Sequence, residues 1–291
     1  MKKVLFIIVL LAAAIRLSAA ERQIFTCEYG GETRTFWLYI PDCAGENAPL
    51  VMLLHGYGGK ADKYCPAITE VADKEGFAVC FPQGEKDYKG KPFWNVGYAF
   101  HKDVTRDDVG FLVFLTDYVC ENWKLDRRNC FFSGMSNGGE MSYLMAHLHP
   151  EAYNAFAPIA GLTMEWTYKQ LKPKAAVPLM EVHGTADKTS LWEGDPTNEG
   201  GWGEYSSVPD AVGRWINEAR CKKEVVTNLP KLSEESNQVI LHRYINCRKA
   251  WKGGPRIEVR LYEVIGGKHS WAMKDMDTCQ EMWDFFKLYL K

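Results

Sequence analysis

The sequence predicts an α/β fold with a mostly parallel central sheet flanked by helices. Continuous apolar runs of strand length, such as 50–54, alternate along the chain with longer segments of helical periodicity, as in proteins built from parallel strands and crossover helices. A glycine-rich turn at 134–139 also lies between a strand-like segment, 129–132, and a helix-like segment, 140–149. Such a strand–turn–helix unit places the residue at the turn on one edge of the sheet.

The composition is that of a globular protein. Of the 291 residues, 46% are hydrophobic and 25% are charged, and no repeat or linker divides the chain. The first 20 residues combine Lys2 and Lys3 with an apolar run, 4–15, and small residues up to Ala20. This pattern predicts a signal peptide over 1–20, because the apolar run is short for a membrane span. We therefore expect a single catalytic domain over 21–291 that is secreted or periplasmic and makes no membrane contact after cleavage.

Charge and cysteine content restrict the possible partners. The formal charge of the whole chain is 35 − 37 = −2, and removal of the three basic residues in 1–20 changes it to 32 − 37 = −5. A mild acidic excess argues against a nucleic-acid partner. Nine cysteines in an exported chain predict disulfides and leave an odd thiol. We expect no metal, because the sequence contains no Cys-x-x-Cys pair or Cys/His cluster with ligand spacing.

Strands are expected where the sequence alternates, or stays apolar for about five residues, and then reaches a turn. Segment 33–41 alternates and stops at Pro41, as an edge strand does. Most of the others are continuous apolar runs, which suit central parallel strands buried on both faces. The predicted strands are 33–41, 50–54, 77–81, 129–132, 155–159, 177–182 and 256–264, with a hairpin-like region around Cys247.

Helices are expected where apolar residues recur every three or four positions between capping signals. Segment 107–123 begins with two acidic residues, which favour a helix N-terminus, and 140–149 ends before Pro150. Segment 82–105 has no regular pattern, and long loops in compact domains often have a functional role. The predicted helices are 61–75, 107–123, 140–149, 208–220 and 278–290.

The turn at 134–139 has the pattern of a nucleophile elbow. In Gly-x-Ser-x-Gly, the glycines at 134 and 138 permit a strained turn that exposes the hydroxyl of Ser136. The backbone amide of Asn137, at the start of the next helix, would then face a developing oxyanion. A second glycine-rich loop, 55–59, follows the strand 50–54, and we expect the amide of Tyr57 to be the other oxyanion-hole donor. The alternatives are a plain glycine turn with a solvated serine and a plain strand-to-helix turn.

The acid and the base of a catalytic triad follow Ser136 in the chain. Asp187 stands directly after the strand 177–182, and His269 lies in a glycine-containing loop after 256–264. The order Ser, acid, His is that of α/β-hydrolases. Rival acids in the loop after Asp187 are Glu193, Asp195 and Asp210, for which a solvated surface charge is the alternative role. His269 would activate Ser136 as a general base, Asp187 would orient the imidazole, and no cofactor is needed.

Aromatic loops provide candidates for substrate contact. The irregular segment 82–105 is rich in aromatic residues, and Trp94 and Asn95 are the pair that we expect to contact substrate. The alternative is that these rings pack the loop onto the core. Trp202, in a glycine-rich loop, and Trp271, two residues after His269, are further candidates.

Taken together, five ordered motifs resemble the secreted feruloyl esterases of carbohydrate esterase family 1 and their relatives described as polyhydroxybutyrate depolymerases. The motifs are His-Gly-Tyr-Gly-Gly at 55–59, Asp-Asp-Val-Gly-Phe at 107–111, Gly-Met-Ser-Asn-Gly-Gly at 134–139, His-Gly-Thr-Ala-Asp at 183–187 and Gly-Gly-Lys-His-Ser-Trp at 266–271. The resemblance implies an α/β-hydrolase fold, a Ser136-Asp187-His269 triad and removal of feruloyl or acetyl groups from plant cell-wall xylan. It also implies a disulfide between Cys221 and Cys247. The chain departs from the family at Lys268, where a glycine is common, and has no Pro after Trp271.

Two other functions stay open on the sequence. A depolymerase of aliphatic polyesters would share the same motifs, but would be expected to carry an exposed apolar patch or an added binding module. A non-catalytic carbohydrate-binding relative is disfavoured, because every position of the triad is filled.

Overall fold

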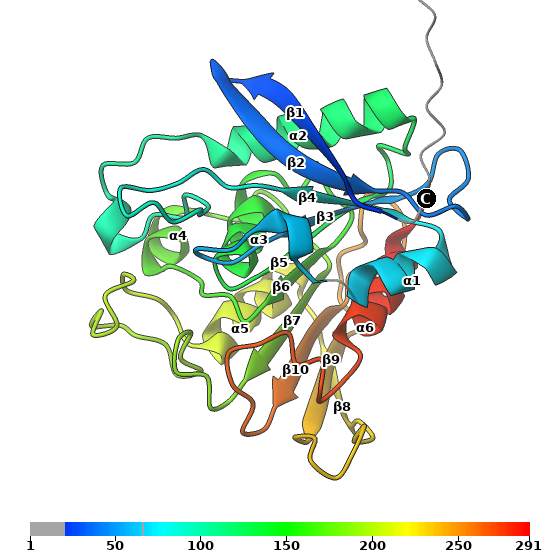
Figure 1. Cartoon of the computed structure of the whole chain (residues 1–291). Helices are drawn as coiled ribbons and strands as arrows, with labels where there is room; N and C mark the ends of the chain where they lie inside the picture. Colours follow the sequence, from blue (N-terminus) through cyan, green and yellow to red (C-terminus); the bar gives the residue numbers. More distant parts are fainter. Residues whose placement is uncertain (1–20, 66) are drawn as a thin grey trace, which may run out of the picture.

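A ten-stranded sheet forms the centre of the protein (Figure 1). The computed structural model describes residues 21–65 and 67–291, so the predicted signal peptide lies outside the described residues. The strands follow one another across the sheet in the order β1-β2-β4-β3-β5-β6-β7-β10-β9-β8. Their bounds are β1 Gln23–Tyr29, β2 Glu32–Tyr39, β3 Leu50–Leu54, β4 Ala78–Pro82, β5 Cys130–Met135, β6 Phe156–Ile159, β7 Leu179–Gly184, β8 Lys223–Asn228, β9 Val239–Ile245 and β10 Val259–Val264.

The six strands in the middle of the sheet, from β4 to β10, are parallel, and antiparallel strands complete the sheet on both sides. All residues of β3, β4 and β6 are buried, as expected for parallel strands covered on both faces. The predicted mostly parallel α/β fold is therefore confirmed.

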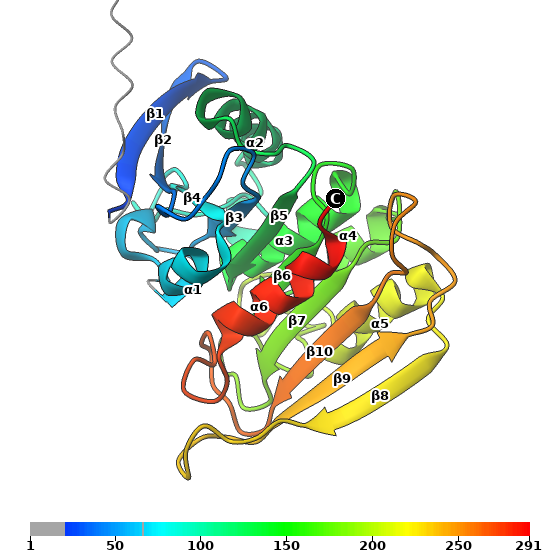
Figure 2. The same ribbon diagram turned by 90° about the vertical axis from the view of Figure 1, so that its right-hand side faces the viewer.

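Helices cover both faces of the sheet. α1 and α6 pack against each other on one face, and α3 and α5 contact the strands from the other face (Figure 2). α2 begins after Asp107, whose side chain accepts a hydrogen bond from the amide of Gly110. The helices are α1 Ala67–Glu75, α2 Asp108–Trp123, α3 Asn137–Leu148, α4 Glu165–Gln170, α5 Val208–Ala219 and α6 Thr278–Phe286, with short 3₁₀ turns η1 Ala61–Lys63, η2 Ala99–His101 and η3 Lys287–Tyr289.

Three sequence-based expectations about the elements were wrong. The segment 33–41 is not an edge strand, because β1, whose sequence alternates only weakly, pairs along its outer side. The helix expected over 61–75 is divided into η1 and α1. The hairpin expected around Cys247 consists of β8 and β9, and Cys247 follows it; both strands extend the sheet beyond β10.

The topology places the ends of several strands at one edge. Because β5, β6, β7 and β10 run parallel, their carboxyl ends lie on the same side of the sheet. The loops after β5, β7 and β10 contain Ser136, Asp187 and His269 respectively. In α/β sheets this edge is where ligands bind.

Candidate active site

Ser136 is held in a strained turn between β5 and α3. Its φ of 58° and ψ of −123° lie outside the regions that non-glycine residues usually adopt. The amide of Ser136 donates to the carbonyl of Ile159 at 2.8 Å, which fixes the turn to the end of β6. A Cβ at Gly134 would lie 2.7 Å from the backbone of Gly138, and one at Gly138 would lie 2.5 Å from the Leu54 carbonyl oxygen. Glycine is therefore required at both flanks of the serine.

The first residue of α3 connects the elbow to the long loop after β4. The buried side chain of Asn137 accepts from the Trp94 amide at 2.6 Å and donates to the Trp94 carbonyl at 3.0 Å. As the first residue of the helix, Asn137 has a backbone N–H with no acceptor inside the helix, at the positive end of the helix dipole. This geometry is compatible with the predicted oxyanion-hole role.

The glycine-rich loop after β3 lies against the nucleophile. A Cβ at Gly56 would be 3.2 Å from Cβ of Ser136. His55 is buried, and its Nε2 accepts from the Gly84 amide at 2.9 Å, so Nδ1 carries the proton and donates to the Gly56 carbonyl at 2.7 Å. Burial lowers the pKa of His55 to about 4. His55 is therefore neutral, and its hydrogen bonds hold in place the loop that contains Tyr57.

Asp187 and His269 form a direct hydrogen bond. Nδ1 of His269 lies 2.7 Å from Oδ2 of Asp187, and the other carboxylate oxygen accepts the amides of Thr189 and Ser190 at 2.8 and 2.9 Å. Burial alone would raise the pKa of Asp187, but the hydrogen bond and charge of His269 and the two amides lower it. With Nδ1 donating to a carboxylate, Nε2 of His269 is the ring nitrogen left to accept a proton.

A second histidine lies behind Asp187. Nδ1 of His183 is 2.8 Å from Oε1 of Glu181, and Nε2 is 2.8 Å from the Ser190 carbonyl and 3.6 Å from Oδ2 of Asp187. Because a carbonyl only accepts, Nε2 must carry a proton. Burial alone would lower the pKa of His183, but the hydrogen bond and charge of Glu181 outweigh it and raise the pKa.

This pair supports the acid and was not predicted from the sequence as a unit. His183 holds Ser190, whose amide in turn holds Asp187. The available signal was the polar pair at positions i and i+2 in a strand whose six residues are all buried, because such residues point to the same face.

The structure argues against substrate contact by Trp94, whereas Asn95 is half-buried and its contact with substrate stays a prediction. Trp94 has no exposed surface, and its indole N–H donates to the His55 carbonyl at 2.9 Å. The side-chain amide of Asn95 donates to the carbonyls of Val104 and Arg106, both at 3.1 Å. The Trp94 ring packs the long loop onto the core, which was the alternative role considered for its aromatic residues, and the hydrogen bonds of Asn95 link two parts of the same loop.

Trp202 and Trp271 are half-buried and keep part of their surface available. The ring of Trp202 packs against those of Tyr57, Tyr98 and Phe100, with centroid distances of 5.1 to 5.7 Å. Trp271 lies 5.8 Å from the ring of Tyr64. Their contact with substrate stays a prediction.

The expected disulfide between Cys221 and Cys247 is confirmed. It joins the segment just after α5 to the segment after β9. The other seven cysteines are free thiols, and four of them form two close pairs. The sulfur atoms of Cys65 and Cys279 are 3.5 Å apart, and so are those of Cys120 and Cys130.

Within residues 21–65 and 67–291, no group of three or more His, Cys, Asp or Glu side chains is arranged to hold a metal ion. Over the same ranges, no helix has both the length and the apolar character needed to cross a bilayer.

Sequence comparison identifies esterases. The family described as "Esterase PHB depolymerase" matches residues 34–212. A bifunctional acetylxylan esterase/xylanase of Neocallimastix patriciarum is 24% identical over 88% of this chain and 33% of its own length. A feruloyl esterase B of Neurospora crassa is 25% identical over 52% of each protein. The chain thus spans about a third to a half of the length of these curated relatives.

Structure comparison gives the fold. An acetyl xylan esterase from Aspergillus awamori superposes with a TM-score of 0.61 and 14% identity over 91% of this chain and 99% of the other. An S-formylglutathione hydrolase from Agrobacterium tumefaciens gives a TM-score of 0.59 and 14% identity over 92% and 95% of the two chains. Together with the sheet topology, these similarities confirm the expected α/β-hydrolase fold.

Proposed function

The chain belongs to the Esterase PHB depolymerase family, and on that premise we propose that it is a serine esterase that removes feruloyl or acetyl groups from plant cell-wall xylan. Its sequence relatives and structural neighbours include acetylxylan and feruloyl esterases. The observation that carries the proposal is the 2.7 Å contact between His269 and Asp187 at the sheet edge that also holds the strained Ser136 turn. Sequence relatives that act on acetylated xylan or feruloyl esters support the choice of substrate.

In the proposed first step, the Ser136 hydroxyl oxygen attacks the ester carbonyl while Nε2 of His269 takes its proton. Asp187 keeps the imidazole in the required tautomer and stabilises the imidazolium that forms. The amides of Asn137 and Tyr57 would bind the oxyanion, and loss of one such donor costs about 3 to 4 kcal/mol of transition-state stabilisation in comparable sites. His269 then protonates the leaving sugar oxygen, which releases the deacylated glycan and leaves an acyl-serine.

Water completes the cycle. His269 removes a proton from water, the resulting hydroxide adds to the acyl-serine carbonyl, and collapse returns the proton to the Ser136 oxygen. The products are a free carboxylic acid, ferulate or acetate, and the regenerated enzyme. Every proton moves through one imidazole.

The test compares three substrates and two serine variants. Purified protein is incubated with methyl ferulate, 4-nitrophenyl acetate and a hydroxybutyrate oligomer, beside Ser136→Ala and the control Ser233→Ala, an exposed serine between β8 and β9. We expect turnover of the first two substrates, loss in Ser136→Ala and retention in Ser233→Ala. Activity retained by Ser136→Ala would remove this serine as the nucleophile.

The polyester depolymerase is the second candidate, because the matching family includes that activity in its description. Preferred turnover of the hydroxybutyrate oligomer would favour it over the xylan esterase. Turnover of none of the substrates would favour a carbohydrate-binding protein without activity.

Export belongs to the proposal as well. We propose that the chain is delivered to the periplasm or the medium and that cleavage after Ala20 leaves Glu21 as the first residue. Edman sequencing of exported protein tests this directly, and an intact leader on exported protein would contradict it.

A further inference from the structure

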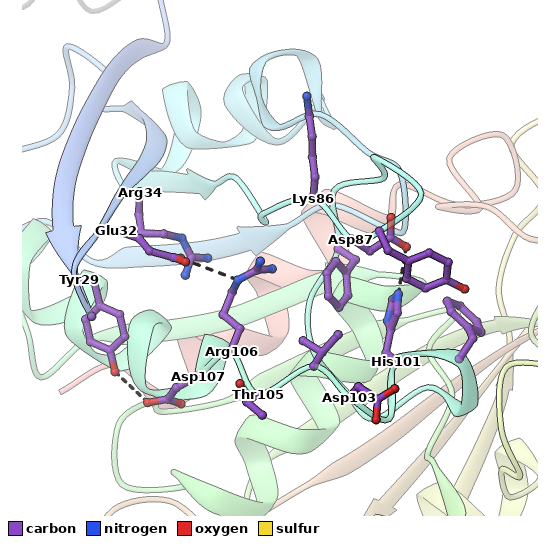
Figure 3. A pocket seen from close by; sticks show the side chains of 15 residues that line it. Tyr29, Glu32, Arg34, Lys86, Asp87, His101, Asp103, Thr105, Arg106 and Asp107 are labelled. Atoms are coloured by element: carbon purple, nitrogen blue, oxygen red, sulfur yellow. Dashed lines mark hydrogen bonds and ion pairs between the residues drawn. The ribbon is translucent and has the colours of Figure 1, made fainter.

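A pocket of about 760 Å³ lies between the tip of the β1–β2 hairpin and the long loop after β4. We call it the hairpin pocket. Figure 3 shows Glu32 and Arg34 of the hairpin on one side and Asp87, His101 and Arg106 of the loop on the other. Because β4 is parallel to β3 and β5, its loop emerges at the same sheet edge as Ser136. None of the three proposed triad residues lines this pocket.

The hairpin pocket adjoins the loop 55–59, which contains the proposed oxyanion-hole residue Tyr57 and is called the oxyanion loop below. Oδ2 of Asp87 accepts the hydroxyl of Tyr57 at 2.6 Å and Nε2 of His101 at 3.0 Å, and Oδ1 accepts the amides of Lys89 and Lys91. Burial alone would raise the pKa of Asp87, but these hydrogen bonds hold it well below its usual range. Asp87 is therefore a fixed carboxylate, with the side chain of Tyr57 on one side and the pocket on the other.

Two aromatic rings give the pocket an apolar surface. Tyr88 is 70% exposed, Phe100 is half-buried, and both line the pocket. Phe100 also belongs to the ring cluster around Tyr57 and Trp202, at 6.0 and 5.7 Å. A continuous aromatic wall thus leads from the oxyanion loop to the pocket. Flat aromatic faces pack well against the C–H face of a pyranose ring, because the ring quadrupole attracts polarised C–H groups.

Polar groups around these rings are both donors and acceptors. Arg34 and His101 are only 1% and 2% exposed, yet Nε of Arg34 and Nδ1 of His101 have no hydrogen-bond partner, and neither does Nη1 of Arg106. Nε of Arg34 has only a 3.6 Å contact with Glu85. Buried polar atoms are nearly always paired in native proteins, by protein groups or by ordered water, so these three nitrogens, which have almost no accessible surface, indicate bound water behind the pocket lining rather than a direct contact with ligand.

The charges of the lining identify the ligand class. The lining contains three cationic side chains and four carboxylates: Arg34, Lys86 and Arg106, and Glu32, Asp87, Asp103 and Asp107. Arg34 is also paired at 3.0 Å with Asp108, which does not line the pocket. This balance is unfavourable for a strongly charged ligand of either sign. Mixed donors and acceptors beside aromatic faces suit the hydroxyl groups of a neutral sugar.

We propose that the hairpin pocket binds a neutral pyranose oligosaccharide segment of the substrate while the ester a few sugars away reaches Ser136. The inference rests on the proposed function, since it assigns the glycan side of that same reaction. The pocket would give the enzyme affinity for polymeric substrate without touching the reacting atoms.

The test uses Tyr88→Ala and Arg106→Gln, with Tyr168→Ala as the matched control, because Tyr168 is an exposed tyrosine on α4 that does not line the hairpin pocket. For each variant, kcat/KM is measured on acetylated xylan and on 4-nitrophenyl acetate. We expect the ratio of the two values to fall about tenfold in Tyr88→Ala and Arg106→Gln, through KM on xylan, and to stay constant in Tyr168→Ala. An unchanged ratio in both pocket variants would overturn the proposal.

Calorimetry separates this inference from the esterase assignment. Ser136→Ala protein is titrated with xylohexaose and with a xylo-oligosaccharide that carries a uronic acid. We expect xylohexaose to bind and the added Tyr88→Ala change to weaken it, and this result would stand even if wild-type protein hydrolysed no ester. Salt-sensitive binding of the acidic oligosaccharide alone would overturn the neutral-sugar assignment.

Discussion

Replacing Glu181 by glutamine removes the counter-charge of a buried histidine while preserving the shape of the side chain. In the wild type, the raised pKa of His183 means that the folded protein keeps the imidazolium at acidic pH, with Glu181 on one side and the Ser190 carbonyl on the other. In Glu181→Gln the buried ring has no carboxylate at 2.8 Å. We expect it to stay neutral, with Nδ1 accepting from the new amide.

The magnitude follows from a second histidine in the same structure. His55 is buried without a hydrogen-bonded carboxylate, and its pKa is about 4 against an ordinary value of 6.5. In the variant, Asp187 remains 3.6 Å from Nε2 of His183 and raises its pKa, so the comparison with His55 gives an upper value. At about pH 5 the unfolded chain then binds a proton that the folded chain largely lacks, which costs up to about 2 kcal/mol at 1.36 kcal/mol per pH unit. In the wild type, the raised pKa of His183 stabilises the folded protein at acidic pH. This stabilisation is fully present below pH 6.5 and is lost as the pH rises through the pKa of His183 in the folded protein.

The stability difference between wild type and Glu181→Gln should therefore grow by about 2 kcal/mol between about pH 8 and about pH 5. Urea unfolding at the two pH values measures it. The control is Glu224→Gln, which breaks an exposed pair with His242 at 2.8 Å and should change stability by less than about 1 kcal/mol. An identical wild-type-to-variant difference at both pH values would refute the charged-pair interpretation of Glu181 and His183.

Three further predictions concern a buried carboxylate, a glycine of the nucleophile elbow and a pair of close thiols. Burial raises the pKa of Glu140 to about 7 from 4.5. As the pH rises from 4.5 to 7, the unfolding free energy of the wild type should therefore fall by about 3 kcal/mol relative to that of Glu140→Gln. Unfolding free energies from urea titrations that change equally with pH in both proteins would contradict this. Gly138→Ala places a Cβ 2.5 Å from a β3 carbonyl and should lower kcat/KM about 100-fold, whereas Gly213→Ala, which meets nothing within 4 Å, should retain activity. Oxidised glutathione should convert the thiols of Cys65 and Cys279, 3.5 Å apart, into a disulfide by thiol–disulfide exchange. Mass spectrometry of a non-reducing digest of the treated, alkylated protein measures this, and alkyl groups found on both cysteines would contradict it.

The parts of the fold that depend on local pattern were predictable. The strand 50–54 and the strand–turn–helix around Ser136 were located from short-range sequence alone, because continuous apolar runs and paired glycines have few other uses. The resemblance carried by five motifs is confirmed at the level of the family. The bond between Cys221 and Cys247 was inferred from that resemblance, not from geometry, and is confirmed.

Features that depend on distant contacts were missed. Trp94 was expected to contact substrate because it lies in a long loop rich in aromatic residues, but hydrogen bonds to the Asn137 side chain and the His55 carbonyl hold it in the core. Nothing near Glu181 in the sequence shows that the carboxylate supports Asp187 through His183 and Ser190. The hairpin pocket also escaped prediction, since its two walls come from segments separated by β3 and β4 along the chain.

The double hydrogen bond between the Asn137 side chain and the Trp94 backbone has a consequence for engineering. The loop that forms most of the hairpin pocket is hydrogen-bonded to Asn137, the residue after the proposed nucleophile. Insertions or deletions in this loop will therefore displace Asn137 as well. Glycan preference and turnover number should change together in loop-grafted chimaeras. Libraries intended to broaden specificity would do better to vary exposed side chains such as Tyr88 and keep the loop length and its anchor at Trp94 constant.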